Sequence, residues 1–111
     1  MQIKTEDKSG AMVCYMNGEI DINTAPQIKK IFDKIISEKK QKILVNFKDV
    51  TYIDSSGLAT LVEMLKHIRG YNGKLKLSNL SSKIKSLFEI TKLDKLFDIV
   101  SNEEEALKGF A

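Results

Sequence analysis

The sequence has 111 residues, 42% of them hydrophobic and 30% charged, and a net charge of only +3. That length suits one domain with a real core, and the weak charge bias gives no reason to expect nucleic acid as a partner. No stretch approaches the ~18 apolar residues that span a membrane, and residues 1–8 lack the apolar segment of a signal peptide. The single cysteine, Cys14, excludes an internal disulfide and lies in an apolar run, so we expect a buried thiol in a cytoplasmic protein with no membrane partner.

The first part of the chain predicts two strands and a helix. Residues 2–5 read as a short edge strand, and residues 11–17 as a second strand that ends at the polar turn 17–19. Thr24 is the expected N-cap of the helix, with Gln27 completing a capping box. Apolar residues at helical spacing form the buried stripe of this helix: Ile28, Ile31, Phe32, Ile35 and Ile36.

The middle of the chain predicts a strand, a helix and a second strand. Residues 43–47 are an apolar run of strand length, a second apolar pair precedes Asp54, and residues 74–78 alternate as a strand does. A helix opens at Ser55 and stops near Gly70. This order is a βαβ unit, so its two strands should be parallel with a right-handed crossover. The buried stripe of the helix comprises Leu58, Leu61, Val62, Leu65 and Ile68, and Met64 at its edge is expected in the core.

The last part of the chain adds a helix capped by Ser81 or Ser82, a short strand at 98–101 and a helix over 103–110. The whole order predicts an α/β fold with one domain spanning residues 1–111. We expect a mixed β-sheet of four or five strands, with about four helices packed mainly on one side.

The sequence does not match the residue patterns of familiar catalytic sites. The only histidine, His67, lies twelve residues beyond Ser55 on the same expected helix, which separates them by roughly 18 Å. His67 therefore cannot act as a base for Ser55 within one chain. One histidine and one cysteine give no transition-metal site of familiar spacing, and no glycine-rich phosphate loop occurs. We expect no catalytic site, no metal and no cofactor.

The segment Asp54-Ser55-Ser56-Gly57-Leu58 is the most informative part of the sequence. One of the two serines can be explained as the N-cap of the helix. A capping box would also need Glu or Gln three residues further on, but that position is Leu58 after Ser55 and Ala59 after Ser56. A glycine in the first turn costs about 0.5–1 kcal/mol against alanine, unless something must approach the backbone closely. Two interpretations stay open here: an N-cap with a packing glycine, or an exposed helix start that accepts an anion or a partner.

This segment, placed after a hydrophobic strand, resembles the signature of STAS domains and most closely that of bacterial anti-sigma factor antagonists. Gly18-Glu19-Ile20-Asp21 before a helix resembles the G-E-[LIV]-D segment of the same group. Residues 83–88 with Leu93 and Phe97 also fit, so the resemblance covers nearly the whole chain.

The resemblance implies a STAS-like domain that works as a binding protein switched by phosphorylation. Such an antagonist binds an anti-sigma factor with serine kinase activity and so releases a sigma factor for transcription. Phosphorylation of a serine in the D-S-S-G segment ends productive binding, and a serine phosphatase restores it. The resemblance places the phosphate on Ser55. The expected partner-binding residues are Asp21, Asp54, Ser56, Gly57 and Thr60.

Position in the helix also favours Ser55 over Ser56. We expect Ser55 at the cap, outside the helical turn, where a kinase can approach its hydroxyl in line. Asp21 and Asp54 could instead be a turn residue and a structural strand-end acid. Two other functions remain open: a STAS module that binds a nucleotide or small ligand or scaffolds a signalling assembly, and a small hydrolase using Ser55.

Overall fold

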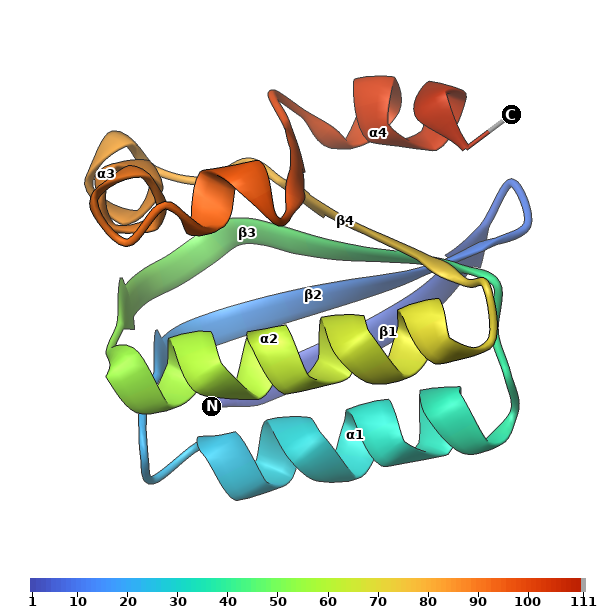
Figure 1. The fold of residues 1–111 in the computed structure, drawn as a ribbon, viewed down its shortest axis with the longest axis horizontal. Helices are drawn as coiled ribbons and strands as arrows, with labels where there is room; N and C mark the ends of the chain where they lie inside the picture. Colours follow the sequence, from blue (N-terminus) through green and yellow to red (C-terminus); the bar gives the residue numbers. More distant parts are fainter. Residues whose placement is uncertain (111) are drawn as a thin grey trace.

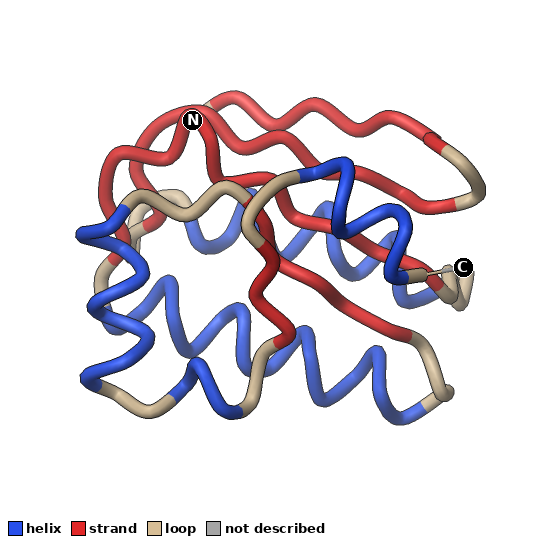
Figure 2. Tube along the Cα trace, turned by 90° about the horizontal axis from the view of Figure 1, so that it is seen from above, coloured by secondary structure: helices blue, strands red, loops and turns tan. Residues whose placement is uncertain are grey.

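The protein is described by a computed structural model that covers residues 1–110 of the chain. A five-stranded sheet has the strand order β1-β2-β3-β4-β5, with β1 antiparallel to β2 and the other neighbours parallel. Figures 1 and 2 show this sheet with helices on both faces. The elements are β1 Gln2–Lys8, β2 Ala11–Ile20, α1 Ala25–Ser37, β3 Lys42–Ile53, α2 Ser55–Gly70, β4 Lys74–Ser78, α3 Ser82–Ile90, the 3-10 turn Leu93–Lys95, β5 Asp98–Val100 and α4 Glu103–Gly109.

The helices divide unequally between the two faces of the sheet. Figure 1 shows α1 and α2 side by side below the sheet and α4 above it. Alternate residues of β3 point to opposite sides, so Ile43, Val45 and Phe47 enter the large core while Leu44 packs under α4 with Ala106. The helix α3 joins the large core, where the Phe88 ring meets Phe47 edge to face with 6.3 Å between centroids. The expected mixed sheet, with helices mainly on one side, is confirmed.

The strand β2 differs from its prediction at its end. It does not turn at residues 17–19 but runs on to Ile20, with Gly18 at a φ of +120°. Its parallel partner β3 is also one continuous strand, and the register shifts between Gly18, opposite Val50, and Glu19, opposite Tyr52. Pairing with a distant strand therefore overrides the local turn signal. As a result, β2 and β3 end beside each other.

The buried apolar stripes predicted for α1 and α2 are largely confirmed. Ile28, Phe32 and Ile35 are buried in α1, and Met64 of α2 is 1% exposed, as a core residue should be. Cys14 is buried in the middle of β2, as expected. Among residues 1–110, no helix is both long enough and apolar enough to cross a membrane, and no cluster of side chains could hold a metal ion.

Candidate functional site

The two motif segments meet at one edge of the sheet. Ile20, the last residue of β2, pairs with Ile53, the last residue of β3, and the Asp54 N–H donates to the Ile20 carbonyl oxygen at 3.1 Å. Asp21 and Asp54 therefore follow neighbouring parallel strands at their carboxyl ends. In open α/β sheets this is the edge at which ligand sites form. The sequence placed these segments just before two helices, and the structure brings those helix starts together.

Asp54, and not Ser55, caps the helix α2. Its backbone is extended and its Oδ1 accepts a hydrogen bond of 2.9 Å from the Gly57 N–H. The expectation that Ser55 occupies the cap is wrong, because aspartate caps as well as serine does and stands one residue earlier. Ser55 and Ser56 are the first and second residues inside the helix.

The two serines differ in exposure. Ser55 is exposed to solvent and Ser56 is half-buried, and neither hydroxyl is hydrogen-bonded to another residue within 1–110. The backbone N–H groups of both serines lie in the first turn of α2, where the helix has no carbonyl four residues earlier to accept from them. They therefore have no hydrogen-bond acceptor within the helix. Asp54 uses only the next N–H, that of Gly57. The start of α2 therefore presents a hydroxyl and backbone donors to solvent at the positive end of the helix dipole.

Packing within the chain explains Gly57. A β-carbon at this position would lie 2.6 Å from Ile20 Cγ2 and 2.9 Å from Ile53 Cγ1, closer than side chains can approach. The close approach that the sequence suggested at this glycine is therefore made by the end of β2. Gly57 is buried and fixes where α2 begins, so any contribution to partner binding would come through the position of its neighbours.

Asp21 organises the loop between β2 and α1. Its Oδ1 accepts from the N–H groups of Asn23 and Thr24 at 2.9 and 3.0 Å. The Thr24 hydroxyl accepts from the Asp21 N–H at 2.9 Å and donates to the Glu19 carbonyl oxygen at 2.8 Å. The predicted capping box is wrong, since Gln27 donates instead to the Met1 carbonyl oxygen at 3.1 Å. The Asp21 carboxylate thus holds a turn and remains half-exposed beside the start of α2.

Thr60 lies one turn further along α2 and is half-exposed. Its hydroxyl donates to the Ser56 carbonyl oxygen at 2.9 Å, so it is already satisfied inside the helix. Glu63, in the next turn, faces the neighbouring helix, where its Oε1 is 3.8 Å from Lys29 Nζ. His67 is still further along the same helix and exposed, consistent with the expectation that it cannot serve Ser55.

A groove beside Ser55 was not anticipated from the sequence. It has a volume of about 450 Å³ and runs between the end of β3, the start of α2 and the helix α3. Its walls are mostly apolar, and Asp54, Ser55 and Lys83 lie along it. The lining residues are Thr51, Tyr52, Ile53, Asp54, Ser55, Leu58, Lys83, Ile84, Leu87 and Thr91. These residues come from two distant segments, so no local motif marks the groove.

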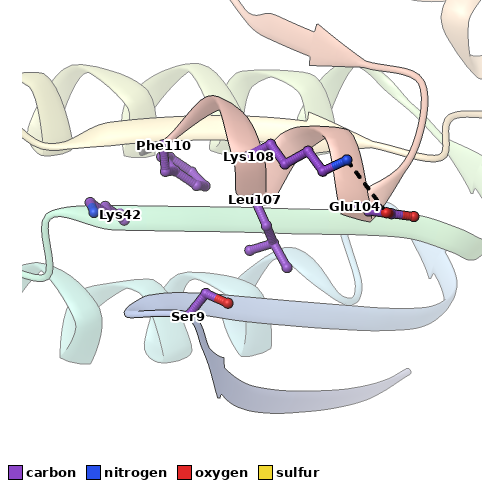
Figure 3. Close-up of a pocket in the computed structure, with 6 residues that line it drawn as sticks. All are labelled: Ser9, Lys42, Glu104, Leu107, Lys108 and Phe110. Atoms are coloured by element: carbon purple, nitrogen blue, oxygen red, sulfur yellow. Dashed lines mark ion pairs between the residues drawn. The ribbon is translucent and has the colours of Figure 1, made fainter.

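A second hollow lies at the other end of β3, under α4, and is drawn in Figure 3. It has a volume of about 380 Å³ and includes Lys42, the first residue of β3. Of its charged side chains, Lys108 and Glu104 pair with each other at 3.6 Å. This hollow is at the amino end of the parallel strands, away from Ser55, and we assign it no role in the site.

Comparison with known proteins agrees with the motifs. The STAS domain family model matches residues 2–106. An anti-sigma-B factor antagonist of Bacillus subtilis (strain 168) is 37% identical over 89 residues, which cover 78% of this chain and 79% of that protein. The solved structure of TM1081 from Thermotoga maritima is similar with a TM-score of 0.91 and 27% identity, covering 96% of this chain and 92% of that one. The structure of the Bacillus cell fate determinant SpoIIAA in its phosphorylated form is similar with a TM-score of 0.76 and 22% identity, covering 99% of this chain and 100% of that one. Since the family model spans nearly the whole chain, the protein belongs to the STAS domain family.

Proposed function

We propose that this protein is an anti-sigma factor antagonist, which acts in transcription regulation by binding an anti-sigma factor and not by catalysis. The observation that carries the proposal is the exposed Ser55 at the start of α2, beside the Asp21 loop, in a chain 37% identical to an anti-sigma-B factor antagonist. The proposed partner is an anti-sigma factor with serine kinase activity. A partner that uses ATP and holds a sigma factor works in the cytoplasm, so the proposal places this protein there as well.

The proposed switch is phosphorylation of Ser55. A phosphate adds about −1.5 to −2 charge at neutral pH. At the start of a helix of 16 residues, that charge meets unpaired N–H groups and the positive end of the dipole, so it should not melt α2. Its effect would fall on the docking surface, through bulk and through repulsion of acidic groups on the partner. Removal of the phosphate by a serine phosphatase would restore binding.

Two features support a binding surface at this place. Asp21 and Asp54 are fixed by hydrogen bonds to backbone N–H groups, so the surface around Ser55 is ordered before any partner arrives. A pre-ordered surface lowers the entropy lost on binding. In addition, the similar protein SpoIIAA has been solved in a phosphorylated form, which is consistent with a phosphorylation switch on this fold.

The test is to incubate the purified chain with a kinase-type anti-sigma factor and to measure affinity by calorimetry before and after phosphorylation. We expect binding of the unmodified protein and at least tenfold weaker binding after ATP treatment. Ser82 is the matched control, because it is also an exposed serine at the first position of a helix, after the cap Ser81. Ser55→Ala should abolish labelling and Ser82→Ala should not. Absence of binding, or equal affinity after full phosphorylation, would contradict the proposal.

A further inference from the structure

We propose that the outer edge of β1 is a self-pairing surface, at which a second copy of this chain adds its own β1 in antiparallel orientation, with Thr5 opposite Thr5. The contact would join two five-stranded sheets into one continuous sheet. None of the candidate site residues lies on β1, so this inference goes beyond the proposed function and can be tested without an anti-sigma factor.

The strand β1 has a long and regular free edge. It comprises the seven residues Gln2–Lys8, and all of them pair with β2 without a register shift. Because β1 is the first strand in the sheet order, no strand of residues 1–110 lies on its outer side. Proteins commonly protect sheet edges with very short strands, prolines or bulges. The opposite edge, β5, is protected in this way because it has only three residues, whereas β1 has none of these features.

The hairpin turn determines which backbone groups of β1 face the open edge. Ser9 and Gly10 form a two-residue turn, with φ of +54° and +81°, that follows Lys8. In such a hairpin the pair next to the turn is hydrogen-bonded, and hydrogen-bonded pairs then alternate with non-hydrogen-bonded pairs. The N–H and C=O groups of Lys8 and of every second residue before it therefore face β2. Those that face outward belong to Ile3, Thr5 and Asp7.

The charges of β1 complement one another in a single register. A two-fold axis at Thr5 places Lys4 opposite Glu6 of the second copy, and Glu6 opposite its Lys4. These residues would form non-hydrogen-bonded pairs, in which opposing side chains come closest. A shift to either neighbouring register would instead place Lys4 opposite Lys4 or Glu6 opposite Glu6. Since like charges directly opposite each other are destabilising, the sequence of charges selects the register centred on Thr5.

The charged side chains of this edge are available to a second copy. Within one chain Lys4 Nζ lies 3.0 Å from Glu6 Oε1, but the Lys4 side chain is 74% exposed. An ion pair on such an exposed surface contributes little to stability, so exchanging it for a pair between two copies costs little. The backbone hydrogen bonds of the joined strands would provide the affinity, and the charges would select the register.

A hollow of about 170 Å³ lies next to this edge, between the strands and α1. Its lining includes apolar side chains from both layers: Met12 of β2 and Ile31 and Ile35 of α1. Thr5 lies on its β1 side. In a sheet joined about a two-fold axis at Thr5, the α1 faces of both copies lie on the same side. The second copy would therefore place its own Thr5 beside this hollow and reduce the exposure of its apolar wall.

Sedimentation equilibrium of the purified chain, from micromolar to millimolar concentration, tests the contact. The wild type should show a reversible equilibrium between monomer and dimer. Lys4→Glu and Glu6→Lys should each weaken association at least tenfold, because the two-fold axis makes each substitution act twice. A variant that carries both substitutions restores opposite charges across the axis and should associate nearly as the wild type does. Lys108→Glu, which reverses an exposed lysine on α4, is the control and should leave association unchanged.

Thr5→Pro tests the backbone contact. Proline removes the outward N–H at the centre of the contact and keeps the groups that face β2, which is why edge strands tolerate it. We expect this variant to remain monomeric at concentrations where the wild type dimerises, with a melting temperature within a few degrees of the wild type. If proline instead lowers the melting temperature strongly, the charge exchange between Lys4 and Glu6 decides, since those side chains are on the surface.

The outcomes separate self-pairing from the proposed function. A wild type that stays monomeric at millimolar concentration overturns the self-pairing. A dimer that both single reversals leave unchanged, or that the double substitution does not restore, overturns it as well, because the copies would then meet elsewhere or in another register. Absence of binding to an anti-sigma factor would contradict the proposed function alone.

Discussion

A β-carbon on Gly57 would lie 2.6 Å from Cγ2 of Ile20 and 2.7 Å from the Ile20 carbonyl oxygen. The helix α2 can therefore begin where it does only because residue 57 has no side chain. The same contact fixes the distance between the Asp21 loop and Ser55, since Ile20 immediately precedes Asp21. The glycine of the D-S-S-G segment thus has a structural reason that is independent of any partner.

Gly57→Ala should therefore destabilise the fold. Overpacking at a rigid contact costs typically about 1–3 kcal/mol, which exceeds the roughly 0.5–1 kcal/mol that alanine gains over glycine in a helix. Gly70 is the control in the same helix, because within the described part of the chain nothing lies within 4 Å of its β-carbon position. Chemical denaturation should show Gly57→Ala less stable than the wild type and Gly70→Ala equal or more stable. Equal stability of the two variants would remove the packing argument.

Two substitutions separate the negative charge of Asp21 from its role in holding the turn. Asp21→Asn keeps the Oδ1 acceptor for the Asn23 and Thr24 N–H groups but removes the charge. It should leave the melting temperature within a few degrees and weaken binding to the anti-sigma factor. Asp21→Ala removes the acceptor too and should cost about 0.5–2 kcal/mol, as the loss of a cap does.

The control for this pair is Glu19→Gln, which removes an exposed negative charge two residues away on β2. It should change neither binding nor stability appreciably. If Asp21→Asn binds as tightly as the wild type while Asp21→Ala unfolds more readily, Asp21 is a turn residue alone.

Much of this fold could be predicted because local signals and tertiary structure agree. The stripe of α1 and the parallel βαβ unit around α2 follow from periodicity and order along the chain. The end of β2 could not be predicted in this way. Residues 17–19 carry a polar turn signal, and only pairing with β3 holds them extended. The register between distant strands leaves no trace in a local pattern.

The sequence suggested residues for the candidate site but not the shape of the surface around them. The motifs pointed to Asp21 and Ser55, yet the N-cap of the helix was expected one residue late, at Ser55 and not at Asp54. The groove joins residues near Tyr52 to residues near Leu87, which only folding brings together. A sequence pattern can mark a helix start, but it does not show which distant helix faces that start.

Cys14 should be unreactive in the native protein and should make stability sensitive to alkaline pH. Burial raises the pKa of this thiol from 9.0 to about 12. Between those two values the unfolded chain loses the thiol proton while the folded chain keeps it, so stability falls as pH rises through this window. Below the ordinary value the thiol makes no contribution to the pH dependence.

The measurement is the free energy of unfolding against pH for the wild type and Cys14→Ala. The alanine variant is expected to be less stable throughout, because it leaves a small cavity, but to show a shallower decline above the ordinary thiol pKa of 9.0. Native alkylation by iodoacetamide should be much slower than alkylation in denaturant. Rapid labelling of the native protein would show that Cys14 is accessible.

Ser55→Ala should remain an active antagonist that the kinase cannot switch off, and Ser55→Glu should be impaired. Since Asp54 provides the cap, Ser55→Ala removes no capping hydrogen bond and should keep nearly full stability. Glutamate adds charge at the docking surface, though less than phosphate does. Affinities for the anti-sigma factor, measured with ATP present and absent, give the comparison. Equal binding by wild type, Ser55→Ala and Ser55→Glu would contradict a switch at this residue.

The phosphate should be found on Ser55 and not on Ser56. Both serines lie inside the first turn of α2, so the difference between them is exposure and not position outside the helix. Ser55 is exposed and lines the groove, whereas Ser56 is half-buried and its carbonyl oxygen accepts the Thr60 hydroxyl at 2.9 Å. In-line transfer needs an open approach to the hydroxyl oxygen, which favours Ser55.

Fragmentation mass spectrometry of the protein labelled by its kinase locates the phosphate, with Ser55→Ala and Ser56→Ala labelled in parallel. We expect label on Ser55 in the wild type, none in Ser55→Ala, and a near-normal rate in Ser56→Ala, since that variant keeps the acceptor and the cap from Asp54 to Gly57. Normal labelling of Ser55→Ala, with phosphate on Ser56, would overturn the assignment.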